Sequence, residues 1–167
     1  MQGLRADPEW EESDVYGNYS EMDKRSRLTS GPLRGSRGLG VQKVFWNARG
    51  KESVSSVFLG EGLEGWPTVV HGGVLATVLD ENLGRVAIRC FPERTGVTAN
   101  LNVSYRAPVY SGNFYTFHSR LDQERSTDRK AFVVGEVRDP GGKVCVQAEG
   151  LFVVPKTYKL RKVGANY

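Results

Sequence analysis

The chain has 167 residues, of which 39% are hydrophobic and 25% charged, which is typical of one soluble globular domain. The net charge of +4 is small and the bases are scattered, and no zinc-finger, helix-turn-helix or RNA-recognition pattern accompanies them, so we expect no nucleic-acid partner. With two histidines, two cysteines and no CxxC pair, the sequence also predicts no metal site and no resident cofactor.

Residues 1–40 are expected to form an N-terminal extension of helical or irregular structure. The first 27 residues carry seven acids and no apolar stretch, which argues against a targeting peptide and favours a cytoplasmic location, with the mitochondrion as the alternative. Acids and aromatics over 9–27 predict one or two short surface helices. The Gly- and Arg-rich segment 31–40 is interpreted as a connector, since its glycines do not follow the dinucleotide-binding spacing.

Residues 41–156 are predicted to form the main domain, and 157–167 a C-terminal tail. Strands are expected over 41–48 and 52–60, with a turn at 49–51 and a loop over 61–67. One long helical pattern covers about 73–89 and stops at Cys90-Phe91-Pro92. Four further strands are expected over 97–106, 114–123, 130–138 and 143–154, the last two joined by a DPGG turn. This order predicts an α+β architecture in which an antiparallel sheet wraps around one helix.

The strand over 97–106 alternates regularly between small or apolar residues and polar ones. One predicted face carries Ala99, Leu101, Val103 and Tyr105, and the other carries Asn100, Asn102, Ser104 and Arg106. Cys90 and Cys145 lie far apart in apolar surroundings, so two buried free thiols are favoured over a disulfide.

The helical pattern has three different sides. The apolar side, which should pack on the sheet, carries Leu75, Leu79, Leu83 and Val86. Glu81 and Arg85 share a second side at i,i+4 spacing, which predicts a solvated ion pair worth about 0.3 kcal/mol. Asp80 falls between the two, among small residues. A carboxylate in such a crevice is partly desolvated, which raises its pKa and makes it a better base; a purely structural acid is the alternative.

His71-Gly72-Gly73 stands at the start of this helix. No Ser, Thr, Asp or Asn cap is present, so the first N–H groups are expected to lack an acceptor nearby in the sequence. Glycines let an outside group approach the backbone, where free amides and the helix dipole favour negative charge. The segment therefore suggests an oxyanion site, against the alternative of plain turn glycines.

The pattern H-G-G-x-x-A-x-x-x-D over residues 71–80, followed by TANLNVSYRAP at 98–108, resembles the hotdog-fold acyl-CoA thioesterases. Within the PaaI-like family, the chain is most similar to the subgroup that contains thioesterase superfamily members 4 and 5. The resemblance covers about residues 55–154. It implies the hotdog fold, in which a long central helix lies inside a curled antiparallel sheet, and hydrolysis of acyl-CoA to free acid and CoA.

The resemblance also implies roles for single residues. Gly72 or Gly73 would polarise the thioester carbonyl through a backbone N–H, with His71 shaping the turn. Asp80 would act as general base on water, or as a nucleophile, and Thr98 would position the water. Because the family shares this site across two subunits, we expect a homodimer or a dimer of dimers.

CoA contacts are implied at Ser104, Arg106, Arg129, Lys130, Ala131 and Phe132. We expect the three bases among them to meet the CoA phosphates at the mouth of the site. Some PaaI-like relatives carry an Asn six residues before the HGG, but Gly65 stands there in this chain, so that part of the mechanism is not transferred. Trp66 is interpreted as part of a lid over the acyl channel.

Two alternatives to a thioesterase remain. A hotdog hydratase or dehydratase needs a catalytic histidine paired with an acid, whereas His71 belongs to the turn and His118 lies in mid-strand without a motif. A non-catalytic acyl-CoA-binding protein would not need Gly72, Asp80 and Thr98 together. The thioesterase is therefore the favoured hypothesis.

Overall fold

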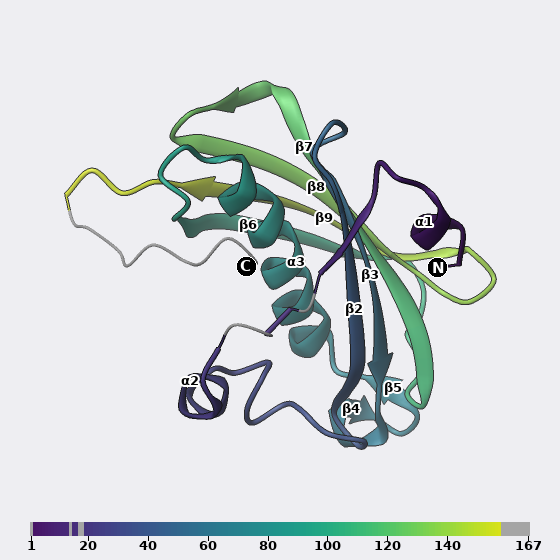
Figure 1. Cartoon of the computed structure of the whole chain (residues 1–167). Coiled ribbons are helices and arrows are strands. Elements are labelled where there is room, and N and C mark those ends of the chain that lie inside the picture. The colour runs from purple at the N-terminus through teal and green to yellow at the C-terminus, as the bar shows by residue number, and fades with distance from the viewer. Residues whose placement is uncertain (1, 14, 17–18, 158–167) are drawn as a thin grey trace.

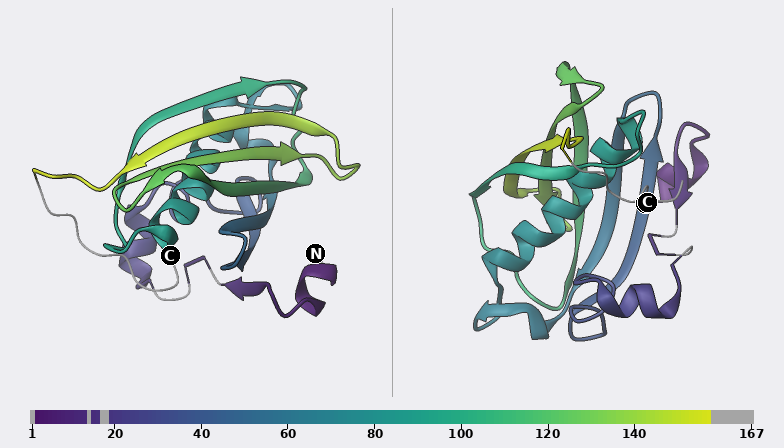
Figure 2. Two further views of the ribbon diagram at one scale, coloured as in Figure 1. Left: turned by 90° about the horizontal axis from the view of Figure 1, so that it is seen from above. Right: turned by 90° about the vertical axis from the view of Figure 1, so that its left-hand side faces the viewer.

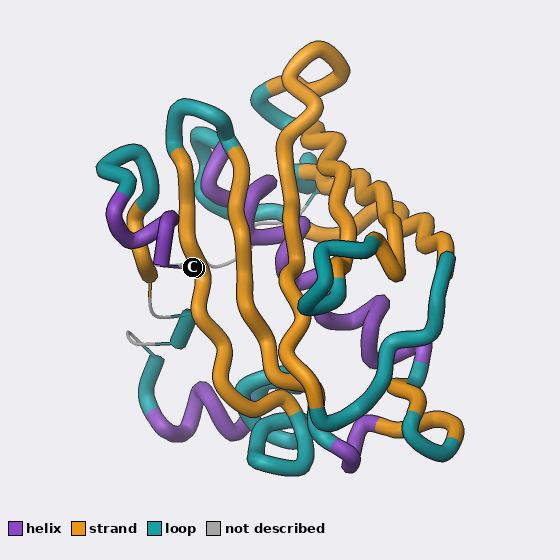
Figure 3. Tube along the Cα trace, turned by 90° about the vertical axis from the view of Figure 1, so that its right-hand side faces the viewer, coloured by secondary structure: helices purple, strands orange, loops and turns teal. Residues whose placement is uncertain are grey.

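The structure is a computed structural model that describes residues 2–13, 15–16 and 19–157. Seven antiparallel strands curl around one long helix, α3 (Gly72–Cys90), as Figures 1 and 2 show. In spatial order the strands are β1 (Glu11–Ser13), β2 (Leu39–Asn47), β3 (Glu52–Leu59), β7 (Asn113–Thr127), β8 (Lys130–Arg138), β9 (Val144–Val153) and β6 (Val97–Tyr105). The predicted α+β architecture is confirmed, and β6 forms one edge of the sheet (Figure 3).

The core lies between α3 and the inner face of the sheet. Leu79, Leu83 and Val86 are fully buried on the predicted apolar side of α3, against strand residues such as Phe117 and Val133. Burial of each such side chain contributes about 1.5–3 kcal/mol. The helix ends at Cys90, where the sequence predicts it to stop, and it begins one residue earlier than expected.

Two regions differ from the expectations. Residues 9–27 form one short helix, α2 (Glu21–Ser26), but also the strand β1, which pairs with β2 and extends the sheet. A further short helix, α1 (Gln2–Ala6), precedes it. Residues 61–67, expected to be a loop, contain a 3-10 turn (Glu61–Leu63) and β4 (Glu64–Trp66), which pairs with β5 (Val69–Val70). β1 forms because the edge of β2 is available, which local sequence does not show.

The Glu81–Arg85 ion pair forms, but the prediction that it is solvated is wrong. Arg85 is only 3% exposed. The Tyr16 hydroxyl donates to the Glu81 carboxylate at 2.6 Å and also bonds the Thr29 hydroxyl at 2.8 Å. The N-terminal segment thus covers this side of α3. Tyr16 lies 65 positions before Glu81, so helix periodicity alone could not reveal the contact.

The remaining expectations concern thiols and chain ends. Cys90 and Cys145 are free thiols, as expected. Within the described residues, no helix has the length and apolarity needed to cross a membrane. Apart from residue 157, the predicted C-terminal tail lies outside the described residues.

Candidate active site

The start of α3 is capped, contrary to the expectation from sequence. His71 takes the N-cap position, and its Nδ1 accepts a hydrogen bond from the Gly73 N–H at 2.9 Å. Histidine is not among the usual capping residues, which is why the sequence suggested an open turn. Gly73 is therefore not a free donor. Of the two glycines expected to supply an oxyanion donor, only Gly72 retains a backbone N–H without an acceptor among the described residues.

The peptide between His71 and Gly72 has a fixed direction. Its carbonyl, that of His71, accepts from the N–H groups of Val74 at 3.0 Å and Leu75 at 3.2 Å, so it points along the helix. The trans peptide directs the Gly72 N–H the opposite way, out of the helix N-terminus. No acceptor for this N–H is found within the described part of the chain. A free N–H at a helix N-terminus attracts negative charge.

Asp80 lies further along α3 and is half-buried. Burial raises the pKa of Asp80, the Thr98 hydroxyl opposes this increase by hydrogen bonding, and the neighbouring Glu81 carboxylate adds to it. The Thr98 Oγ1 donates to the Asp80 Oδ1 at 2.8 Å. The structure thus brings together the carboxylate and the hydroxyl that the sequence singled out, although they are 18 positions apart. A desolvated carboxylate with an adjacent hydroxyl is suited to taking a proton from water.

Thr98 reaches Asp80 because of an irregularity in β6. The register with β9 shifts between Thr98 and Asn100, so that Thr98 stands opposite the buried Phe152, whereas Asn100 stands opposite Leu151. Residues directly opposite each other point to the same face of a sheet, so Thr98 faces α3. Regular alternation would have placed Thr98 on the outer face with Asn100. A β-bulge re-aims a side chain in this way.

The turn and the carboxylate of one chain do not form a single compact site. Asp80 follows Gly72 by eight positions, which at 1.5 Å per residue is about 12 Å along the helix axis. This separation is too long for one thioester carbonyl to reach both. On β6, Thr98 contacts Asp80 at the middle of α3, whereas the Tyr105 hydroxyl donates to the Gly72 carbonyl at the N-terminus of the helix.

The structure does not bring the expected CoA contacts of one chain together. Lys130 stands opposite Val153 at one end of β9, whereas the Arg106 N–H bonds the Cys145 carbonyl at the other. Cys145 and Val153 are eight positions apart along β9, which corresponds to about 26 Å. Arg129 is exposed at the Lys130 end, and its guanidinium donates to the Val154 carbonyl at 2.9 Å.

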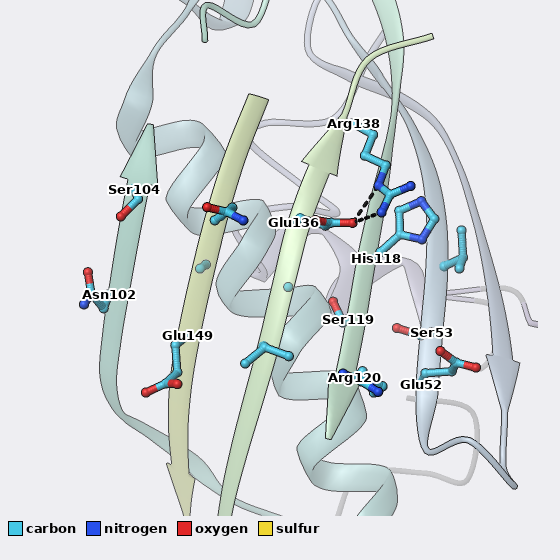
Figure 4. Close-up of a pocket in the computed structure, with 15 residues that line it drawn as sticks. Glu52, Ser53, Asn102, Ser104, His118, Ser119, Arg120, Glu136, Arg138 and Glu149 are labelled. Atoms are coloured by element: carbon cyan, nitrogen blue, oxygen red, sulfur yellow. Dashed lines mark hydrogen bonds and ion pairs between the residues drawn. The ribbon is translucent and has the colours of Figure 1, made fainter. Parts of the chain in front are cut away.

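The other expected CoA residues lie on different faces of the sheet. Ala131 is buried in the core, opposite Phe152 and thus in the same row as Thr98. Phe132 lies on the outer face, with the Arg125 guanidinium 4.1 Å from its ring centre. Ser104 also points to the outer face (Figure 4).

This outer face carries a groove of about 590 Å³ across five strands. Charged and polar side chains line it, among them His118, Glu136 and Arg138 (Figure 4). Glu136 is paired with Arg138, and the His118 Nε2 lies 3.2 Å from the Thr116 hydroxyl. Burial lowers the pKa of His118, and the nearby Arg138 charge lowers it further. The sheet separates this groove from Asp80.

Sequence reasoning missed one residue of the turn. The Tyr105 hydroxyl donates to the Gly72 carbonyl at 2.7 Å. The alternation in β6 correctly put Tyr105 on the face of Leu101 and Val103, which pack against the core. Tyr105 lies at the end of β6 that is far from Thr98. Because Thr98 was expected near Asp80, this position could have indicated that Tyr105 lies near the start of the helix. Trp66, interpreted as a lid, is 75% exposed on β4.

Known proteins share both the sequence and the fold. A sequence model of the thioesterase superfamily matches residues 68–146. The mouse (Mus musculus) acyl-coenzyme A thioesterase THEM4 is 30% identical over 89% of this chain and 64% of its own length. A crystal structure described as a thioesterase superfamily protein is 31% identical and superimposes with a TM-score of 0.59, covering 68% of this chain and 53% of that one. A Bacillus halodurans protein crystallised with CoA is 25% identical, with a TM-score of 0.54 over 60% of this chain and 65% of that one.

Residues 68–146 match the thioesterase superfamily, and the chain has the hotdog fold, with relatives in the acyl-CoA thioesterase THEM4 group. The family resemblance seen in the sequence is thereby confirmed. The chain spans 64% of the length of mouse THEM4 and 64% of the length of a fission-yeast (Schizosaccharomyces pombe) protein to which it is 29% identical.

Proposed function

We propose that the chain is an acyl-CoA thioesterase that hydrolyses the thioester to free acid and CoA. The observation that carries this proposal is the hydrogen bond from the Thr98 hydroxyl to the half-buried Asp80. Burial raises the pKa of Asp80, and the N-terminus of the same helix offers a free N–H. The THEM4 relatives are named acyl-coenzyme A thioesterases, and the B. halodurans relative was crystallised with CoA, which supports the same substrate class.

In this mechanism Asp80 is the general base. The Thr98 hydroxyl and the Asp80 carboxylate hold a water molecule, and Asp80 takes its proton as the oxygen attacks the thioester carbon. The Gly72 N–H and the dipole of α3 stabilise the negative charge on the carbonyl oxygen. Collapse of the intermediate breaks the carbon–sulfur bond and releases CoA thiolate, which takes up a proton. Attack by Asp80 itself through a mixed anhydride is the alternative route.

We propose that each site combines the Gly72 turn of one subunit with Asp80 and Thr98 of another. The separation of about 12 Å along α3 supports this arrangement, because one carbonyl group cannot contact both ends. The free edge of β6 offers a place for a second copy to pair. The same pairing would bring Arg106 of one chain toward Arg129 and Lys130 of the other, as CoA phosphate binding requires.

The histidines give a hydratase less support. Nδ1 of His71 is used by the helix cap, and His118 lies on the outer face beside a glutamate that is already paired with Arg138. Neither histidine is paired with Asp80 among the described residues. The cytoplasmic location and the absence of a cofactor remain predictions.

The test is hydrolysis of a panel of acyl-CoAs, followed through the released thiol, by the full chain and by Asp80→Asn. We expect Asp80→Asn to lower kcat at least about 100-fold, since a general base contributes that much. Burial raises the Asp80 pKa, so stability of the native chain falls as pH rises through that pKa. Asn carries no charge, so the variant should unfold at pH 7 no more readily than the native chain.

A folded Asp80→Asn protein with near-native turnover would contradict the role of Asp80. A native chain that releases no thiol from any acyl-CoA, but binds CoA by calorimetry, would instead identify a binding protein.

A further inference from the structure

Tyr105, at the end of β6, holds the backbone of the Gly72 turn. Its hydroxyl donates to the Gly72 carbonyl at 2.7 Å, and its ring packs so close that a methyl group on Gly72 would lie 3.3 Å from the ring carbon Cζ and from the hydroxyl oxygen. The neighbouring backbone is tied to the same region, since the Val70 N–H bonds the Val109 carbonyl at 2.8 Å.

The peptide between Gly72 and Gly73 is therefore fixed at both ends. Its oxygen accepts from Tyr105, and its N–H donates to His71 Nδ1 at 2.9 Å. Glycine has a wide choice of backbone angles, so two consecutive glycines make an intrinsically soft turn. The two hydrogen bonds hold this planar peptide, and they restrict the rotation about the Gly72 backbone that joins it to the preceding peptide, which carries the Gly72 N–H.

We propose that Tyr105 is a positioning residue that pre-orients the Gly72 N–H toward the substrate oxygen. The inference rests on the proposed thioesterase function. An oxyanion donor is effective only when it already points to where charge develops, so that no reorientation is needed during the reaction. Since the Tyr105 hydroxyl is engaged by the Gly72 carbonyl, it acts through the turn and does not touch the substrate.

The decisive variant is Tyr105→Phe, which keeps the ring and removes only the hydroxyl. We expect kcat for acyl-CoA to fall roughly five- to tenfold, the effect of losing one neutral hydrogen bond, with KM unchanged. Tyr110→Phe is the matched control, because Tyr110 is similarly exposed and its backbone N–H, not its hydroxyl, makes the hydrogen bond to Tyr115. This control should keep native kcat and KM.

Two ligands separate positioning from a structural role. A trifluoromethyl ketone analogue of acyl-CoA adds water or an enzyme group and carries an oxyanion-like oxygen, whereas a thioether analogue has no carbonyl. Tyr105→Phe should weaken the ketone by the same factor as kcat and leave the thioether unaffected. Equal loss for both ligands, an unchanged kcat, or a lowered melting temperature with native kcat would each overturn the inference.

Gly72→Ala is the second variant, and its own kcat is informative without a folded Tyr105→Phe protein. Its methyl group pushes against the Tyr105 hydroxyl but leaves the N–H in place, so kcat should fall and a double variant with Tyr105→Phe should lose less than the sum of both. Additive losses would overturn the inference. If the native chain itself hydrolyses no acyl-CoA, the proposed function fails; if the native chain is active and Tyr105→Phe equals it, only the positioning role fails.

Discussion

At the scale of single residues, Asp80 and Thr98 have opposing effects on one proton. Burial raises the Asp80 pKa and thereby makes the carboxylate a stronger base, whereas the Thr98 hydroxyl stabilises the ionised form and keeps it available. A carboxyl group whose pKa lies above the working pH would stay protonated and could not accept a proton. The hydrogen bond thus balances the basicity of Asp80 against the fraction of Asp80 that is ionised.

Thr98→Val should shift the acid limb of the pH profile. Without the hydroxyl, the Asp80 pKa rises further, and because the base must be ionised, the fall of kcat/KM on acidification should begin at a higher pH. Above this limb kcat should remain reduced, since the water loses one of its partners, while KM changes little. Thr116→Val on the outer face is the control. A pH limb at the same position in Thr98→Val and the native chain would exclude the coupling.

At the scale of elements, α3 combines the side that carries Asp80 with a buried polar side. Asn82 accepts from the Ser55 hydroxyl, donates to the Val78 carbonyl at 2.7 Å and lies beside Arg85, which pairs with Glu81. A buried ion pair loses hydration that its attraction barely offsets, so removing one partner is far more costly than the pair is stabilising. Glu81 is therefore held by its ion pair with Arg85, whereas the adjacent Asp80 has no cationic partner among the described residues.

Arg85→Met should lower the free energy of unfolding by about 3 kcal/mol, since it leaves the Glu81 charge buried without its cation. Denaturant unfolding measures this loss. Arg49→Met, which breaks the exposed pair with Glu9, should leave the midpoint unchanged. Equal effects of the two substitutions would mean that the Arg85 pair is solvated, as helix periodicity alone suggests.

The main elements were predictable because their signals are local. The apolar stripe of α3 and the alternation of the long strands follow from short-range periodicity, and the DPGG turn from its residue types. The features that were missed depend on distant residues. β1 needs the edge of β2, the bulge at Thr98 depends on the register with β9, and the burial of Arg85 depends on Tyr16.

The candidate site was predictable in composition rather than in geometry. The helix pattern singled out Asp80 and the glycine turn, and the resemblance to a family added Thr98. The structure adds that Thr98 and Asp80 are in contact. The His71 cap was missed because imidazole is an uncommon capping group. The contact between Tyr105 and Gly72 spans 33 positions and has no local signature.

At the scale of the whole molecule, β6 carries both Thr98 and Tyr105 on the free edge of the sheet. Pairing two copies through this edge would assemble both halves of the proposed site and cover unpaired backbone groups in one step. Activity would then depend on assembly.

Mixing two inactive variants tests this dependence. Gly72→Pro removes the proposed oxyanion donor at the first helical position, where proline is tolerated, and Asp80→Asn removes the base. If sites are shared, a mixed dimer contains one native site, so unfolding and refolding the variants together should restore about a quarter of native activity. No recovery, from a mixture that sedimentation shows to be dimeric, would place the whole site within one chain.

The N-terminal segment sets a limit on how far the chain can be shortened. A fragment that begins at residue 41 would lose β1 and Tyr16, leaving β2 as an open strand edge and a charged helix side facing water. Open edges recruit further strands, so such a fragment would tend to self-associate and precipitate even though every residue of the proposed site is present. For recombinant production, a fragment should therefore retain the segment that carries β1 and Tyr16.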